Sequence, residues 1–338
     1  MKRRRLAASL LLVLALAGVV AGYQYVNASF GSFTQPVLVE IRYGASSPEI
    51  ALRLAGNGIV RHPAAFLLVR LVRPRVTLQA GEYQFDKPAS AWEIFDRIVR
   101  GDVHFYRVQV PEGSNIFETA RLVGNLDFVG EQDFLKAAQD PSLILDLAPE
   151  ATSLEGYLFP STYFVTRAAT AASIAGMMVN QFRSVWASLD ATEDPHRTVT
   201  FASLVEKETG IASERPVVAG VYANRLRRGM RLECDPTVIY AALLENRYRG
   251  AIYRSDLDRQ HPYNTYRTSG LPPGPIASPG AEALRAALRP ARTDYLFLVA
   301  KPDGSGEHVF SATNTAHNRA VREYRRGRAQ AARQTGSR

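Results

Sequence analysis

The sequence contains almost no cysteine. Cys234 is the only one in 338 residues, so the chain cannot form an intramolecular disulfide, and zinc sites built from paired thiolates are excluded. Neither neighbour of Cys234 is a histidine. A small buried side chain is therefore a better interpretation of this cysteine than a catalytic nucleophile.

Patterns that hold metals or cofactors are also lacking. The histidines are scattered and form no His-Glu-x-x-His pair, and no phosphate-binding glycine loop or nucleophile elbow is present. The sequence alone does not exclude a Ser-His-Asp triad assembled from distant segments. The sequence predicts no metal, nucleotide or other cofactor. The six histidines are His62, His104, His196, His261, His308 and His317.

The central part of the chain lacks net charge. The total is +9, from 41 basic and 32 acidic residues. Residues 2–5 contribute four of the basic ones, and residues 319–338 contribute seven arginines against one glutamate. Residues 6–318 therefore hold 30 basic and 31 acidic residues. Because the positive charge is confined to the two ends, no nucleic-acid partner is expected. The length and the 46% hydrophobic content favour two globular domains.

A long apolar run lies at the N-terminus. Residues 6–22 contain no charge and follow a basic tip, residues 1–5. This pattern predicts a single-pass anchor in the inner (cytoplasmic) membrane, with the N-terminus cytoplasmic and the remaining chain extracytoplasmic. The alternative is a signal peptide cleaved after Ala28. Residues 23–36 are interpreted as a spacer.

The fold class expected for the exported part is α+β. Residues 37–112 follow a strand and helix pattern that resembles a LysM-type glycan-binding module; a simple α+β spacer domain is the alternative. Ser47 is expected to cap the first helix, and Ser90 and Glu93 form a capping box. The expected elements are strands at 39–43, 76–85 and 103–110 and helices at 47–56, 63–72 and from 90.

Residues 113–318 are expected to form a larger, mainly helical catalytic domain with short strands. Asp235 is interpreted as the N-cap of a helix that begins at Pro236. Residues 270–280, rich in proline and glycine, predict a stiff ordered loop. Residues 319–338 form a basic tail, which is interpreted most simply as a solvated helix end. Attraction to anionic lipid or to cell-wall phosphate is the alternative. Helices are expected at 115–125, 131–139, 172–189, 200–209 and 213–228, and a hairpin at 294–311.

One carboxylate occupies an unexpected helical position. Phe201, Leu204, Val205 and Glu208 recur with the period of one helix face, where an apolar side chain is expected at position 208. Glu206 is rotated by about 160° from Glu208 and is expected to face away. Burial and a position in the last helical turn both favour the protonated form of Glu208, as a general acid requires. A buried glutamate paired with Arg225 is the structural alternative.

Several short segments, taken in order, resemble the YceG-like family of endolytic murein transglycosylases. The resemblance implies that one glutamate of the Glu206-Lys207-Glu208 segment is the catalytic acid/base, and the Glu208-Thr209 pair is similar to the Glu-Ser pair of other lytic transglycosylases. Helical phase selects Glu208, with Glu206 in reserve. The segments are residues 154–163, 202–209, 213–215, 221–226, 229–232, 235–240, 263–266, 270–274 and 316–318.

The resemblance also implies a substrate and a reaction. The substrate is the glycan strand of peptidoglycan, cleaved between MurNAc and GlcNAc to leave a 1,6-anhydro end, beside membrane-bound peptidoglycan synthases as partners. The candidate substrate-binding residues are Glu155, Asn224, Arg225, Tyr263, Asn264 and Tyr266. Glu155 and its aromatic neighbours could equally belong to the core. A hydrolase using Glu208 with Glu155 or Glu206, and a non-catalytic glycan-binding scaffold, are the alternative functions.

Overall fold

The computed structural model describes residues 2–335, with side chains described for residues 5–330. Parts of the predicted basic tip and basic tail therefore lie outside the described residues. The chain divides into two compact units, one comprising residues 1–106 with 164–168 and the other residues 107–163 with 169–338. Mixed helices and small sheets agree with the expected α+β class.

The first unit begins with a long apolar helix. Helix α1 spans Lys2–Asn27, and residues 5–27 are long and apolar enough to cross a membrane by length and composition. Its apolar side chains are exposed rather than packed into a core, Leu12 by 72% for example. Only the end of the helix is buried, at Val26.

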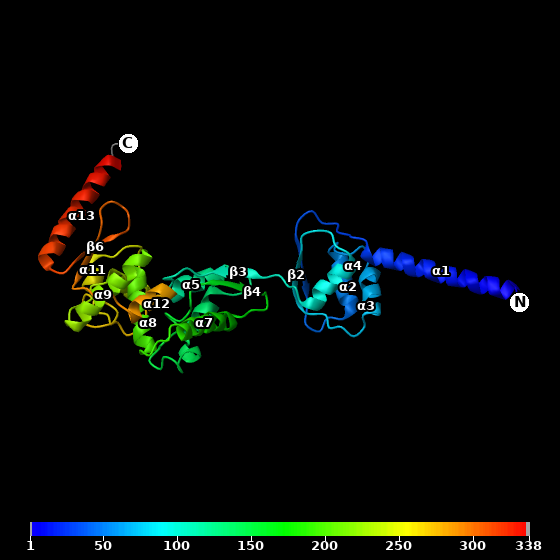
Figure 1. Ribbon diagram of the computed structural model, residues 1–338, viewed down its shortest axis with the longest axis horizontal. Helices are drawn as coiled ribbons and strands as arrows, with labels where there is room; N and C mark the ends of the chain where they lie inside the picture. Colours follow the sequence, from blue (N-terminus) through cyan, green and yellow to red (C-terminus); the bar gives the residue numbers. More distant parts are fainter. Residues whose placement is uncertain (1, 336–338) are drawn as a thin grey trace. The chain divides into compact units, whose positions relative to one another are not determined.

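A small sheet and three helices form the rest of this unit (Figure 1). Strands β1 and β2 pair antiparallel with Val39 opposite Tyr83, and the helices cover them around a core that contains Leu54, Phe66 and Phe95. The expected capping box of Ser90 with Glu93 is present. The elements are β1 (Val37–Ile41), α2 (Ser47–Gly56), α3 (Pro63–Val72), β2 (Gly81–Phe85) and α4 (Ala91–Arg100).

Two predicted helix caps are wrong by one residue. Ser46, not Ser47, caps α2, because its hydroxyl accepts the Glu49 backbone N–H while Ser47 is already helical. Cys234, not Asp235, is the N-cap position of α10, and Asp235 is the first helical residue. The Asp235 carboxylate instead accepts a 2.6 Å hydrogen bond from the hydroxyl of Tyr266. Tertiary contacts therefore outweigh the local capping preference.

The second unit is mainly helical. Strands β3 (Tyr106–Gln109) and β4 (Thr162–Val165) pair in one two-stranded sheet, and β5 (Phe297–Ala300) pairs antiparallel with β6 (His308–Ser311) in another. The helices are α5 (Ile116–Gly124), α6 (Glu131–Gln139), η1 (Pro141–Leu143), α7 (Ala171–Ser188), α8 (Pro195–Glu208), η2 (Ala212–Glu214), α9 (Arg215–Arg227), α10 (Asp235–Leu244), α11 (Arg254–Leu257), α12 (Ala281–Leu288) and α13 (Asn314–Thr335).

Helix α8 lies at the centre of this unit. Helices α9, α10 and α12 all pack against it, and α8, α9 and α12 are grouped together in Figure 1. The loop of residues 270–280 is ordered as expected and largely buried. Its backbone bonds to α8 through Ile276, whose N–H donates to Oγ of Ser203 at 3.1 Å. The packing of α8 and its bond to this loop together fix the position of the end of the helix.

Candidate active site

Helix α8 is buried on almost every face. It starts where Asp194 accepts the backbone N–H of Arg197 at 2.6 Å, and Pro195 fits the first turn. His196 and every residue from Thr198 to Glu206 are buried, whereas Arg197 and Lys207 are exposed and Glu208 is half-buried. Glu208 is the last helical residue, as the position of Gly210 indicates.

Glu208 is held through one of its two carboxylate oxygens. The hydroxyl of Tyr222 on α9 donates to Oε2 at 2.6 Å, and the thiol of Cys234 lies 3.6 Å from the same oxygen. Among the described residues, Oε1 has no hydrogen-bond donor. A half-buried carboxylate with one fixed and one available oxygen is suited to exchange a proton with a bound molecule.

The two groups that contact Glu208 remain protonated. Burial, with the neighbouring Cys234 and Glu208 adding to it, raises the pKa of the Tyr222 hydroxyl. Burial, followed by the charge of Glu208, likewise raises the pKa of the Cys234 thiol well above its usual range. Both groups therefore stay hydrogen-bond donors at neutral pH. The same shift makes Cys234 a poor nucleophile, because the thiolate is the reactive form.

Glu206, which is expected to face away from the stripe that ends at Glu208, is also buried. Its side chain is only 5% exposed and pairs with Arg215, Oε1 to Nη2 at 2.7 Å. Oε2 accepts the N–H of Gly280 at 3.0 Å, and Arg215 also binds Glu112 at 3.0 Å. Neighbouring elements pack around α8, so the side of the helix that carries Glu206 is interior as well.

The Glu206 carboxylate is fully engaged. Burial raises its pKa, against the opposing effects of the Gly280 N–H and Arg215. A Cβ on Gly280 would lie 2.0 Å from a carboxylate oxygen of Glu112, so a larger residue here would displace the Glu112 side chain. Glu206 therefore joins α8 to the start of α9 through Arg215 and to the start of α12 through Gly280.

Residues on both sides of Glu208 are also fixed. The ammonium of Lys207 donates to the carbonyl of Gly113 at 3.0 Å, and the hydroxyl of Thr209 donates to Glu214 at 3.2 Å. Glu214 in turn accepts hydrogen bonds from the backbone and ring of His308, both at 2.8 Å. Despite burial, these His308 contacts hold the pKa of Glu214 below its usual value. The backbone around Glu208 is thus held from several directions.

The structural alternative that pairs Glu208 with Arg225 is wrong. The Arg225 guanidinium instead binds Glu233 and the carbonyls of Leu232 and Leu296, at 3.1, 2.9 and 2.6 Å. Its neighbour Asn224 donates to the carbonyls of Thr293 and Tyr295, both at 2.8 Å. These two candidate substrate-binding side chains thus hold the segment that leads into β5.

The loop carrying Tyr263, Asn264 and Tyr266 is anchored beside Cys234. The backbone N–H of Cys234 donates to Oγ1 of Thr265 at 2.9 Å. Tyr266 is bound to Asp235 as described, and the ring of Tyr263 lies 5.0 Å from that of Tyr240. Tyr266 and Glu208 therefore contact adjacent residues, Asp235 and Cys234, whereas Tyr263 packs on Tyr240.

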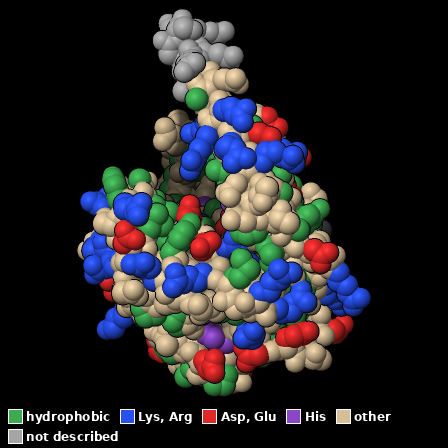
Figure 2. Space-filling model, turned by 90° about the vertical axis from the view of Figure 1, so that its left-hand side faces the viewer, with side chains coloured by type: hydrophobic (Ala, Val, Ile, Leu, Met, Phe, Trp, Pro, Cys, Tyr) green, Lys and Arg blue, Asp and Glu red, His purple; other side chains and the backbone are tan. Residues whose placement is uncertain are grey.

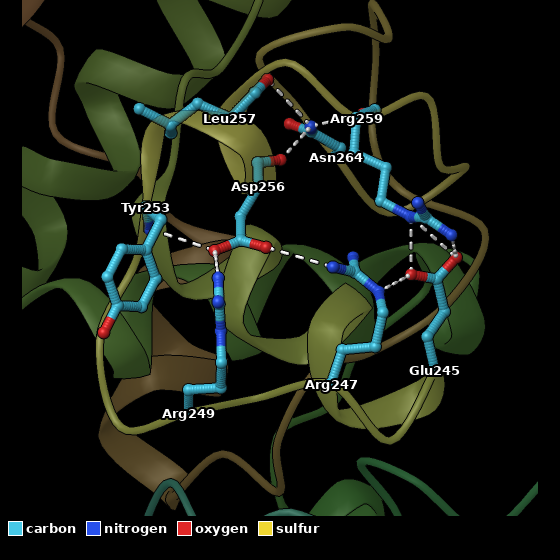
Figure 3. Close-up of polar contacts among 8 residues, drawn as sticks. All are labelled: Glu245, Arg247, Arg249, Tyr253, Asp256, Leu257, Arg259 and Asn264. Atoms are coloured by element: carbon cyan, nitrogen blue, oxygen red, sulfur yellow. Dashed lines mark hydrogen bonds and ion pairs between the residues drawn. The ribbon is translucent and has the colours of Figure 1, made fainter.

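Asn264 has a structural task within this loop. It is 1% exposed, and its amide donates to the carbonyls of Asp256, Leu257 and Arg259 (Figure 3). In the same view the Asp256 carboxylate accepts a hydrogen bond from the N–H of Tyr253 and forms ion pairs with Arg247 and Arg249. These contacts keep the loop rigid and occupy the Asn264 amide.

Glu155 lies in the interior at the start of α5. It is 2% exposed and accepts the N–H groups of Ile116 at 3.0 Å and Gly156 at 3.3 Å. Burial raises its pKa to about 8, against the effect of these hydrogen bonds and one from Tyr240. The N–H donors at the helix N-terminus favour the ionised carboxylate, so burial is what favours a neutral carboxyl here.

Sequence reasoning missed the partners of Glu208. Tyr222 lies 14 positions along the chain and Cys234 26 positions, so no local motif signals either contact. His308 is 94 positions from Glu214. Among residues 5–330, whose side chains the structure describes, no group of three or more His, Cys, Asp or Glu side chains is placed to hold a metal ion.

The model of the YceG-like family matches residues 39–323. The chain belongs to the YceG-like family. All segments from which the resemblance was drawn fall within the matched range.

Relatives extend this result. A Bacillus subtilis (strain 168) protein named endolytic murein transglycosylase is 31% identical over 309 residues, which cover 85% of this chain and 84% of that protein. A protein of the same name from Streptococcus pneumoniae serotype 2 is 30% identical over 94% of this chain, and the chain spans 64% of its length.

A solved structure is also similar. The 2.6 Å crystal structure of a YceG-like protein from Listeria monocytogenes matches with a TM-score of 0.54 and 29% identity. The match covers 84% of this chain and 99% of the Listeria chain.

Proposed function

We propose that this protein is a membrane-anchored endolytic murein transglycosylase. It cleaves the β-1,4 bond between MurNAc and GlcNAc within peptidoglycan strands and leaves 1,6-anhydroMurNAc ends, which terminates nascent strands. The names of the relatives support the activity. The observation that carries the proposal is Glu208, held at Oε2 by Tyr222 with Oε1 available at the end of a rigid helix.

In the proposed mechanism Glu208 moves one proton in each direction. The protonated carboxyl donates to the glycosidic oxygen as its bond to C1 of MurNAc breaks. The resulting carboxylate then takes the proton of the MurNAc C6 hydroxyl, whose oxygen bonds to C1 and closes the anhydro ring. Protons balance and Glu208 is regenerated.

The environment of the other carboxylates favours this reaction over hydrolysis. A hydrolase needs a second carboxylate free to activate water or attack the sugar. Glu206 is bound on both oxygens, by Arg215 and Gly280, and Glu155 is enclosed at the start of α5. Neither is placed to act as that second group, whereas a transglycosylase requires only Glu208.

We also assign roles to the other parts of the chain. Residues 6–22 within α1 serve as the anchor, with residues 1–5 cytoplasmic and residues 37–112 as a LysM-like glycan-binding module. Residues 113–318 form the catalytic domain on the extracytoplasmic side. We assign substrate binding to Tyr263 and Tyr266, and the bond of Tyr266 to Asp235, the residue next to Cys234, supports this role for Tyr266. Membrane-bound synthases are the expected partners.

Product analysis tests the reaction. The full chain, in detergent or vesicles, is incubated with purified peptidoglycan in water enriched in ¹⁸O, and the fragments are weighed by mass spectrometry. The proposal expects anhydro ends that contain no ¹⁸O and no newly formed reducing ends. Reducing ends that carry the label would instead identify a hydrolase and overturn the proposal.

A further inference from the structure

Helix α13 is docked on the second unit by one face. The ring of His317 stacks on Phe297 with centroids 5.0 Å apart, and Ala320 is 7% exposed. Further along, Gly327 approaches the hairpin turn so closely that a Cβ there would lie 2.4 Å from Pro302. The helix is therefore a fixed part of this unit well beyond residue 323, where the match to the family ends.

The other face of α13 is strongly basic. Five arginines between positions 319 and 328 are exposed, and none of them forms an ion pair with a described residue. Glu323 is the only acidic residue in this stretch. Figure 2 shows Lys and Arg side chains gathered on the segment that leads to the C-terminus. The five are Arg319, Arg322, Arg325, Arg326 and Arg328.

This arrangement separates α13 from helices that insert into a bilayer. Its small apolar stripe, with Ala320 and Tyr324, faces the hairpin and is not available for lipid chains. An exposed face of unpaired guanidinium groups remains, and guanidinium binds phosphate oxygens through two parallel hydrogen bonds. Such a face binds a phosphate-bearing surface through its positive charge.

We propose that the arginine face of α13 binds the anionic phospholipid headgroups of the membrane. This inference rests on the proposed anchoring by α1, which keeps the bilayer at a high local concentration. Each arginine near an anionic surface strengthens binding by about fivefold. A tethered enzyme with this second contact works next to the bilayer, where new strands emerge.

The test uses the full chain in vesicles. Because Cys234 is buried, a cysteine introduced as Gln330→Cys can be labelled selectively with a fluorescent donor, and an acceptor is placed on lipid headgroups. Vesicles of phosphatidylcholine with 30% phosphatidylglycerol are compared with pure phosphatidylcholine. We expect strong energy transfer only with phosphatidylglycerol, and its loss in high salt.

Matched variants identify the arginines. The triple change R322Q/R325Q/R326Q should weaken headgroup contact on the order of 100-fold, whereas the same positions changed to Lys should retain it. Arg121, Arg254 and Arg289, exposed elsewhere on the same unit, give a control triple Gln variant with unchanged transfer. Equal transfer with both vesicles, or a signal that appears only after soluble teichoic acid is added, would overturn the proposal.

Peptidoglycan cleavage by the same vesicles separates the two proposals. Anhydro products without headgroup contact would refute the role of α13 alone. Absence of anhydro products from the wild type would refute the proposed function, whatever the fluorescence shows.

Discussion

The hydroxyl of Tyr222 donates a 2.6 Å hydrogen bond to Oε2 of Glu208, and this contact joins α9 to the last residue of α8. Because Tyr222 is 2% exposed, the bond is shielded from water and fixes the direction of the carboxylate. The available oxygen, Oε1, thereby has a fixed direction although no described residue donates a hydrogen bond to it.

Tyr222→Phe should lower kcat with little change in KM. Removing a hydrogen bond to a charged group costs about 1.5–3 kcal/mol, which corresponds to roughly 10- to 100-fold if the bond acts in the transition state. Steady-state cleavage of peptidoglycan measures this effect. Tyr43→Phe, at a 98% exposed tyrosine, is the control. A tenfold rise in KM at constant kcat would show that Tyr222 binds substrate instead.

Arg215→Met should strongly destabilise the fold. The change leaves the buried Glu206 without its charged partner, and breaking such a pair by removing one side typically costs about 3–5 kcal/mol. Urea unfolding followed by circular dichroism gives the free energy of unfolding. The double variant E206Q/R215M should recover part of this loss, because no charge is then buried. A loss below about 1 kcal/mol for the single variant would show that the pair is not structural.

Glu155→Gln should flatten the pH dependence of stability. The pKa of Glu155 is about 8 in the fold against 4.5 ordinarily, so the folded state binds the proton more tightly than the unfolded state. Its contribution is complete below pH 4.5 and is lost as the pH rises through 8. The difference between these two pKa values limits the contribution of Glu155 to the free energy of unfolding to roughly 5 kcal/mol.

Urea unfolding of wild type and Glu155→Gln between pH 5 and pH 9 checks this sign. The variant should gain stability relative to wild type as the pH rises. Parallel curves for the two proteins would mean that Glu155 titrates near its ordinary value.

Cys234 should resist thiol reagents in the native protein. Burial beside Glu208 keeps its thiol protonated, and the thiolate is the form that reacts. Labelling with a maleimide should proceed at the rate of unfolding and become rapid in denaturant. Fast labelling of the native chain would show that the surroundings of Glu208 open readily.

The sequence predicts local features better than distant contacts. Helix α3 matches its predicted bounds, Pro63–Val72, because proline and a regular apolar face mark it. The strand expected at 76–85 shortens to Gly81–Phe85, since pairing with β1 decides where the strand begins. Periodicity correctly places Glu208 at the end of α8.

The sequence could not reveal which carboxylate has both oxygens bound by other groups of the protein. Glu206 and Glu208 have similar local surroundings, and only the fold brings Arg215 and Gly280 to one and Tyr222 to the other. Asn264 likewise appears suited to bind sugar, but its amide is used by three backbone carbonyls. Long-range partners, absent from any local pattern, decide these roles.

Peptidoglycan digestion by the wild type and by Glu208→Gln tests the central claim most directly. Glu282→Gln, at an exposed glutamate of α12, serves as the control, and circular dichroism with glycan pull-down verifies folding and binding. The account predicts anhydro fragments from the wild type and the control, and at least a 100-fold lower rate from Glu208→Gln with binding retained. Cleavage by Glu208→Gln at the wild-type rate would contradict it.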